Sequence, residues 1–225
     1  MPARCDNHMT DVKICGVTSD ETLEAAIQAG AKYIGLVFFD KSPRNISFDD
    51  ARVLAGIARG RAQIVALLVD PDDGFIDELK RRVGPDIFQL HGRETPERTA
   101  ALRQRGDAEI WKAISVASAE DVALARAYNR GADLVLFDAK PPKDRGALPG
   151  GNGLAFDWRI VAQAAWDRPF ALAGGLTPEN VADAIKLIDP QIVDVSSGVE
   201  CSPGVKDPQA IESFIRAAKT AKQSP

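Results

Sequence analysis

Short apolar runs rich in Val, Ile, Leu, Phe and Ala recur along the whole chain, and longer amphipathic stretches separate them. The runs lack clean alternation with polar residues, which is typical of parallel strands covered on both faces. They predict strands at residues 12–16, 33–38, 63–69, 86–90, 109–114, 133–137, 170–173 and 192–195. The stretches between them predict helices, among them residues 20–29, 48–59 and 178–187.

Two of these helices carry a start signal. Thr177-Pro178 is typical of an N-cap followed by proline in the first helical turn, and predicts that a helix begins there. Ser47, with Asp50 three residues later, is a looser example of the same signal. Both signals place a helix directly after a predicted strand and its loop.

The order of elements makes eight strand–helix units without a break that resembles a linker. Right-handed crossovers leave two architectures for such a chain, a closed barrel or an open doubly wound sheet. Eight units in 225 residues favour a single (β/α)8 TIM barrel, and no Gly-x-Gly-x-x-Gly turn follows the first strand. We expect residues 11–225 to form the barrel and residues 1–10 to form a flexible N-terminal arm.

One stretch, residues 139–153, breaks this rhythm because it holds too much Pro and Gly for a helix or a strand. It follows the sixth strand, at the end of the barrel where catalytic loops lie. A plain connector is one interpretation. Long connections in compact domains are more often functional, which favours a loop that covers the substrate.

Composition narrows the class of protein. The 45% hydrophobic and 27% charged residues are ordinary for a globular domain, and the net charge of −4 offers no basic field for nucleic acid. No apolar run has the length of a membrane span, and residues 1–9 do not resemble a secretory signal. The three cysteines have no metal-like spacing. We therefore expect a cytoplasmic enzyme with a small-molecule partner, and no nucleic acid, membrane or obligatory protein partner.

The C-terminal strand ends are the place to search for a site, because active sites of this fold lie there. After the seventh and eighth strands come glycines and hydroxyls: Gly174, Gly175, Asp194, Ser196, Ser197 and Gly198. They could simply make tight turns. Their joint position instead favours a phosphate clamp, built from the two neighbouring loops as is recurrent in this fold.

Four other strand-end side chains could carry chemistry. Cys15 and Asp138 follow strands one and six, and could serve as a general base and a general acid. Each also has a plain interpretation, as a buried small side chain and as a strand-end cap. Arg44 suits a carboxylate, and His91 could bond a substrate, although a solvated arginine and a strand cap would look the same in sequence.

Seven motifs in order and spacing resemble the phosphoribosylanthranilate isomerase family, from about Val12 to the last helix. They are Lys13-Ile14-Cys15-Gly16, Gly35-Leu36-Val37-Phe38-Phe39 with Ser42-Pro43-Arg44, Gln89-Leu90-His91-Gly92, Leu136-Phe137-Asp138-Ala139-Lys140, Leu148-Pro149-Gly150-Gly151, Leu172-Ala173-Gly174-Gly175-Leu176 and Asp194-Val195-Ser196-Ser197-Gly198-Val199-Glu200.

The resemblance implies an Amadori rearrangement of N-(5-phosphoribosyl)anthranilate in tryptophan biosynthesis, without cofactor or metal. It implies that Asp138 protonates the furanose ring oxygen and that Cys15 removes the proton from C2 of the sugar. Arg44 is expected to hold the anthranilate carboxylate, and the two glycine loops are expected to hold the phosphate. Leu154 stands where the family usually has Lys or Gln, which puts one loop contact in doubt.

Two rival functions are set against this one. Indole-glycerol-phosphate synthase and the tryptophan synthase α subunit are barrels that use acidic and lysine groups, and the pairing of Cys15 with Asp138 speaks against them. A catalytically silent barrel that binds a phosphorylated ligand or a partner protein would show binding without turnover.

Overall fold

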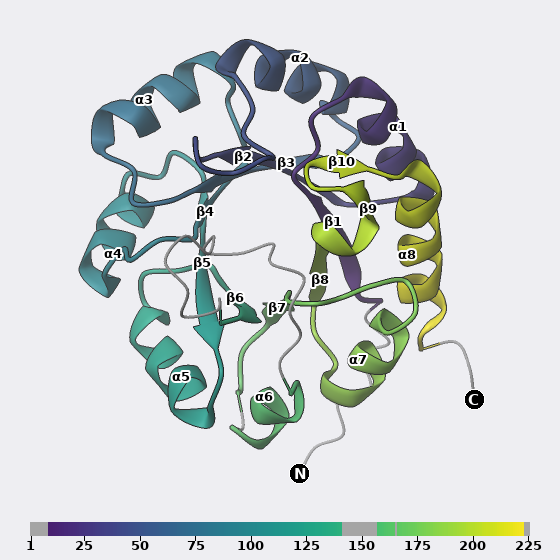
Figure 1. The fold of residues 1–225 in the computed structure, drawn as a ribbon. Helices are drawn as coiled ribbons and strands as arrows, with labels where there is room; N and C mark the ends of the chain where they lie inside the picture. Colours follow the sequence, from purple (N-terminus) through teal and green to yellow (C-terminus); the bar gives the residue numbers. More distant parts are fainter. Residues whose placement is uncertain (1–8, 141–156, 165, 223–225) are drawn as a thin grey trace.

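The computed structural model describes residues 9–140, 157–164 and 166–222. Within them, eight parallel strands close into a barrel in sequence order, and the helices form an outer ring around it (Figure 1). The strands are β1 (Asp11–Cys15), β2 (Tyr33–Phe38), β3 (Gln63–Leu68), β4 (Ile87–Leu90), β5 (Glu109–Val116), β6 (Leu134–Ala139), β7 (Phe170–Leu172) and β8 (Ile192–Val195). The predicted TIM barrel is confirmed, and the doubly wound sheet is excluded.

The connecting segments follow the predicted plan. The helices are α1 (Asp20–Ala29), α2 (Phe48–Ala58), α3 (Asp73–Arg82), α4 (Pro96–Gln104), α5 (Ala119–Leu124), α6 (Arg159–Gln163), α7 (Val181–Ile188) and α8 (Pro208–Thr220), with short 3-10 helices η1 (Ala125–Tyr128) and η2 (Ser197–Val199). A hairpin that the sequence did not reveal, β9 (Glu200–Ser202) with β10 (Val205–Lys206), follows β8. Cys201 is an exposed residue of β9.

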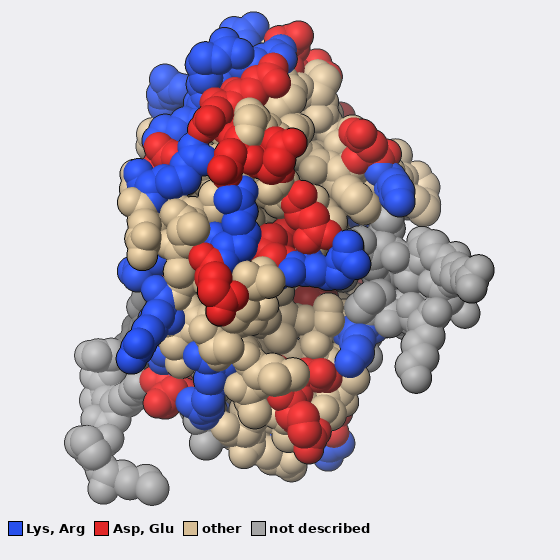
Figure 2. All heavy atoms as spheres, turned by 90° about the vertical axis from the view of Figure 1, so that its left-hand side faces the viewer, with Lys and Arg blue, Asp and Glu red and all other residues tan. Residues whose placement is uncertain are grey.

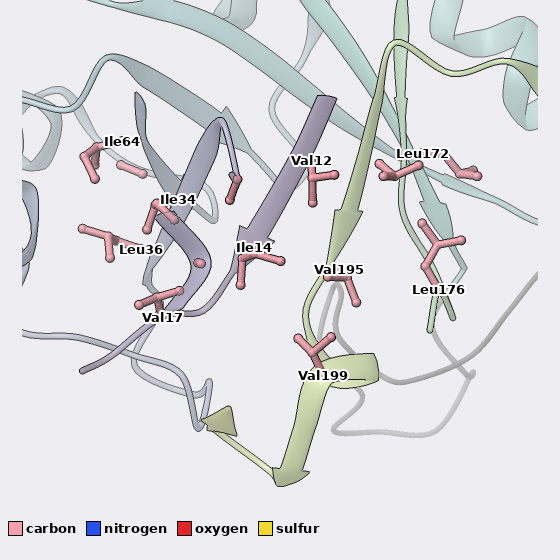
Figure 3. Close-up of a cluster of buried hydrophobic side chains, with 14 of the residues drawn as sticks. Val12, Ile14, Val17, Ile34, Leu36, Ile64, Leu172, Leu176, Val195 and Val199 are labelled. Carbon is pink, nitrogen blue, oxygen red and sulfur yellow. The ribbon is translucent and has the colours of Figure 1, made fainter. Parts of the chain in front are cut away.

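Alternation along each strand divides the barrel interior from the helix layer. On β1, Val12 and Ile14 belong to the large apolar cluster between strands and helices, whereas Lys13 and Cys15 occupy the opposite face. Figure 3 shows part of that cluster, with residues from β1, β2, β7 and β8 and with Val199 from η2. A second apolar cluster lies inside the barrel and consists of Tyr33, Val65, Ile87, Trp111, Ala113, Leu134, Leu136, Ala171, Ala173 and Ile192.

Local capping explains where the helices begin. Ser47 Oγ accepts the Asp50 N–H at 3.1 Å and so caps α2 as predicted. The start predicted for the helix after β7 is wrong. Thr177 and Pro178 belong to a turn, in which Asn180 Oδ1 accepts the Thr177 N–H at 2.8 Å, and α7 begins at Val181. Thr177 caps this turn, because its Oγ1 accepts the Glu179 N–H at 3.3 Å and its carbonyl oxygen accepts the Val181 N–H at 3.1 Å. The Thr-Pro signal therefore marks the turn that leads into α7, one turn before the helix itself.

The outer face over α3 and α4 is densely charged, and Figure 2 shows Lys and Arg interleaved with Asp and Glu there. Arg105 lies between the two helices and pairs with Asp77 and Asp107, while Arg98 pairs with Asp73 at 2.6 Å. Both signs are present in close pairs, so this face has little net field. None of the helices that the structure describes is long and apolar enough to pass through a membrane.

Two sequence predictions fall largely outside the described residues. Of the segment 1–10, only Met9 and Thr10 are described, and Thr10 Oγ1 donates to the Pro190 carbonyl at 3.0 Å. The Pro- and Gly-rich stretch 139–153, with Leu154 after it, is described only at Ala139 and Lys140.

Candidate active site

Cys15 and Asp138 lie at the C-terminal ends of β1 and β6, on the inner face of the barrel. They are 4% and 5% exposed, so both side chains are buried. Along the shorter way round the ring, β8 and β7 separate their strands, which places the two residues on nearly opposite walls. A substrate between them would meet a thiol on one side and a carboxyl group on the other.

Two groups lie next to the carboxyl group of Asp138. Its Oδ1 accepts the Ala139 N–H at 2.8 Å, and its Oδ2 lies 3.2 Å from Nε2 of His91. Nδ1 of His91 in turn lies 3.2 Å from Nε2 of Gln89, an interior residue of β4. Gln89 was not singled out from the sequence. It sits two residues before His91, on the same face of the strand, and this spacing was the available signal.

Two cationic groups, Lys13 and Lys206, lie near Cys15. Lys13 precedes it by two residues, is fully buried, and donates to Asp194 Oδ1 at 2.9 Å. Burial raises the pKa of the Cys15 thiol, and the charge of Lys13 opposes that rise. Asp194 was predicted to bind substrate. It is paired with Lys13 in the parallel register of β1 and β8, and its carboxylate faces Lys13 inside the barrel.

Arg44 packs directly against Gly16, the residue after Cys15, because Gly16 has no side chain. A β-carbon at Gly16 would come within 2.6 Å of Arg44 Cδ. Glu200 holds the guanidinium, accepting from Nε at 2.7 Å and from Nη2 at 2.8 Å. The side chains of Arg44 and Glu200 are only 6% and 4% exposed, so the solvated-arginine interpretation is excluded.

Lys206, from the unpredicted hairpin, joins the same group. Its Nζ donates to Glu200 Oε1 at 2.6 Å and to the Ser196 carbonyl and hydroxyl oxygens at 3.0 and 3.2 Å. Burial lowers the pKa of Lys206, and Glu200 opposes this. Arg44 and Lys206 together hold the pKa of Glu200 at about 2 despite its burial. Nothing in the local sequence pattern indicated this contact.

The loops after β7 and β8 meet each other. Gly174 and Gly175 have φ of 84° and 67°, which favours glycine. A β-carbon at Gly198 would lie 1.9 Å from the Leu176 carbonyl oxygen, so the η2 segment packs directly on the loop after β7. Among the described residues, the backbone N–H groups of Gly174, Gly175 and Gly198 have no acceptor. Such N–H groups can bind an anion.

A second buried pair supports the opposite side of the ring. Lys112 on β5 donates to Glu94 Oε2 at 2.8 Å and to the Gly92 carbonyl oxygen at 2.8 Å. Glu94 also accepts the Asp70 N–H, which ties the loops after β3 and β4 together next to His91. In the described part of the chain, no group of three or more His, Cys, Asp or Glu side chains is placed to hold a metal ion.

A family profile and curated proteins match most of this chain. The profile of the family described as N-(5'-phosphoribosyl)anthranilate isomerase matches residues 12–217. The protein of that name from Parvibaculum lavamentivorans is 51% identical over 211 residues, which are 93% of this chain and 98% of that protein.

Solved structures give the same result. The crystal structure of phosphoribosyl anthranilate isomerase from Thermotoga maritima superimposes with a TM-score of 0.84 and 35% identity, over 94% of this chain and 99% of that one. A structure of such an enzyme in complex with reduced 1-(o-carboxyphenylamino)-1-deoxyribulose 5-phosphate gives a TM-score of 0.81 and 34% identity, over 94% and 99% of the two chains.

Proposed function

This chain belongs to the N-(5'-phosphoribosyl)anthranilate isomerase family, and we propose that Cys15 is the general base of its reaction and Asp138 the general acid. The protein is an isomerase of tryptophan biosynthesis. It converts N-(5'-phosphoribosyl)anthranilate into 1-(2-carboxyphenylamino)-1-deoxyribulose 5-phosphate, an Amadori rearrangement.

In the proposed mechanism, Asp138 donates a proton to the furanose ring oxygen as the bond between that oxygen and C1 breaks. The nitrogen lone pair forms the C1=N bond of a Schiff base. Cys15 then removes the proton from C2, and the electron pair of that C–H bond shifts to give an enolamine. Protonation at C1 and loss of the O2 proton complete the ketose, so no electrons enter or leave.

The observation that carries this proposal is the placement of two buried ionisable groups on nearly opposite walls of one barrel end. Acid–base catalysis needs each group within reach of its own proton. Asp138 has His91 beside it, and Cys15 has Lys13 and Lys206. Each group therefore lies next to polar or charged side chains.

The substrate's two anionic ends suit the remaining residues. We assign the anthranilate carboxylate to Arg44, whose orientation Glu200 fixes. We assign the phosphate to the N–H groups of Gly174, Gly175 and Gly198, with the hydroxyls of Ser196 and Ser197 at the same loops. Asp194 supports the site from below through Lys13. We also infer a cytoplasmic location and no obligatory protein partner.

Turnover of freshly generated N-(5'-phosphoribosyl)anthranilate, followed by loss of its fluorescence, tests the assignment. Cys15→Ala and Asp138→Asn are each expected to lower kcat/KM at least about a hundredfold, the usual range for one acid–base group. Cys201→Ala, at an exposed thiol, is the matched control and should retain activity. Near-normal turnover by Cys15→Ala would overturn the assignment of the base. A folded wild type that binds a phosphorylated analogue without turnover would support the silent barrel.

A further inference from the structure

Lys13 and Cys15 share one small space inside the barrel. They are two residues apart on β1, so both point inward, and both approach Gly35 on β2. A β-carbon at Gly35 would lie 2.8 Å from Cys15 Sγ and 3.1 Å from Lys13 Nζ. The ammonium group therefore lies close beneath the thiol, with Asp194 as its carboxylate partner at 2.9 Å.

Complete burial of the Lys13 ammonium has a large desolvation cost. Lys13 has no exposed surface, and it donates a hydrogen bond to the carboxylate of Asp194. Burying an ammonium and a carboxylate costs about as much as their attraction returns, and a well-packed apolar pair is often at least as stable. Stability alone therefore does not explain a lysine here, and its effect on a neighbour is the better explanation.

The neighbour that gains is Cys15. Burial raises the pKa of the Cys15 thiol, which works against a base that acts as the thiolate. Attraction from Lys13 is the largest opposing influence, repulsion from Asp194 is smaller, and Lys206 adds a weaker attraction. Burial also lowers the pKa of Lys13, but Asp194 and Cys15 together raise it above its ordinary value, so Lys13 stays charged at neutral pH.

We propose that Lys13 is a positioning residue that stabilises the thiolate form of Cys15 when Cys15 acts as the base, and that Asp194 serves this arrangement by holding the Lys13 ammonium beneath the sulfur. The inference rests on the proposed role of Cys15. In this arrangement the buried Lys13–Asp194 pair acts on the reaction through Cys15.

The experiment titrates the Cys15 thiol directly. Cys5 and Cys201 are replaced by Ser, so that Cys15 is the only thiol and its thiolate absorbance can be followed against pH. The test variant is Lys13→Met with Asp194→Asn, which removes both charges and leaves no lone buried carboxylate. The pKa of Cys15 should rise by at least about one, a tenfold loss of thiolate at neutral pH. The rise of kcat/KM with pH, which follows deprotonation of Cys15, should move to higher pH by the same amount. The activity of the variant should therefore recover in alkaline buffer.

Two further variants separate charge from packing. Lys112→Met with Glu94→Gln removes a second buried lysine–carboxylate pair away from Cys15, and should leave the thiol pKa unchanged. Lys13→Arg keeps the cation and should keep the thiol pKa near that of wild type. An unchanged Cys15 pKa in the Lys13→Met, Asp194→Asn protein would overturn the inference. Failure of the proposed base would appear separately, as turnover that survives Cys15→Ala.

Discussion

Arg44 and Glu200 are 156 residues apart in the chain, yet they form a bidentate ion pair at 2.7 and 2.8 Å. The pair joins the loop after β2 to the hairpin after β8, across the end of β1. Two parallel hydrogen bonds fix the plane of a guanidinium as well as its position. Glu200 therefore determines how Arg44 meets a substrate carboxylate.

Glu200→Gln tests this relationship. The amide keeps the shape of the side chain but loses the charge and one of the two acceptors, so Arg44 is held less firmly. We expect KM to rise about tenfold, equivalent to one charge-assisted hydrogen bond of about 1.4 kcal/mol, with kcat less affected. Steady-state kinetics measures both. An unchanged KM would show that Arg44 does not depend on Glu200, or does not bind the substrate.

The same carboxylate should influence stability in acid. The pKa of Glu200 is about 2 in the folded protein, against an ordinary value of 4.5. Its stabilising contribution is therefore complete above about pH 4.5 and is lost as the pH falls towards 2. This contribution to the free energy of unfolding is up to about 3 kcal/mol, because each unit of difference between the unfolded and folded pKa corresponds to about 1.4 kcal/mol. Urea unfolding at several pH values should show the gap between wild type and Glu200→Gln shrinking across this range.

Glu24 provides the control for acid stability. Its pKa is also held at about 2, chiefly by Arg61, but both side chains are exposed. Water screens such a surface pair, so Glu24→Gln should change the free energy of unfolding little at any pH. Equal effects of the two variants would mean that burial of the Glu200 pair is unimportant.

The barrel could be predicted from the sequence because strands that are buried on both faces consist of short runs of apolar residues. β2 and β8 begin and end at the predicted residues, and α1 does too. Cys15 and Asp138 could be placed because the fold puts its chemistry at strand ends. Lys13 was within reach of the same reasoning, since it alternates with Cys15 on one face of β1.

Other parts of the site depend on contacts that no local pattern encodes. Lys206 and Glu200 come from a short hairpin without a strong strand signal, and their partner Arg44 is far away in sequence. The start of α7 was misplaced by one turn because Thr177 caps a turn over residues 178–180 that precedes the helix. Long-range ion pairs and the exact start of a helix were the features that sequence reasoning missed.

The contact between the two glycine loops predicts the behaviour of Gly198→Ala. Its methyl group would meet the Leu176 carbonyl oxygen at 1.9 Å, so the loops must separate. We expect weaker inhibition by inorganic phosphate and a higher KM, each by about tenfold or more. Gly56→Ala, where no atom lies within 4 Å, is the control and should stabilise α2 by about 0.5–1 kcal/mol. Unchanged inhibition of Gly198→Ala by phosphate would contradict the assignment of the substrate phosphate to these loops.

His91 presents a choice that kinetics can decide. The Nε2 atom of His91 lies 3.2 Å from Asp138 Oδ2 but lacks a well-aligned acceptor among the described residues. Gln89 donates to Nδ1, which leaves the ring proton on Nε2, facing Asp138. A small rotation would complete the hydrogen bond, as often happens when substrate binds.

We therefore expect His91→Phe to lower kcat about tenfold or more while KM stays within about twofold, because the acid loses its orientation. His91→Gln retains a donor and should recover part of kcat. If His91 instead binds substrate, as the sequence suggested, His91→Phe will raise KM and leave kcat close to wild type.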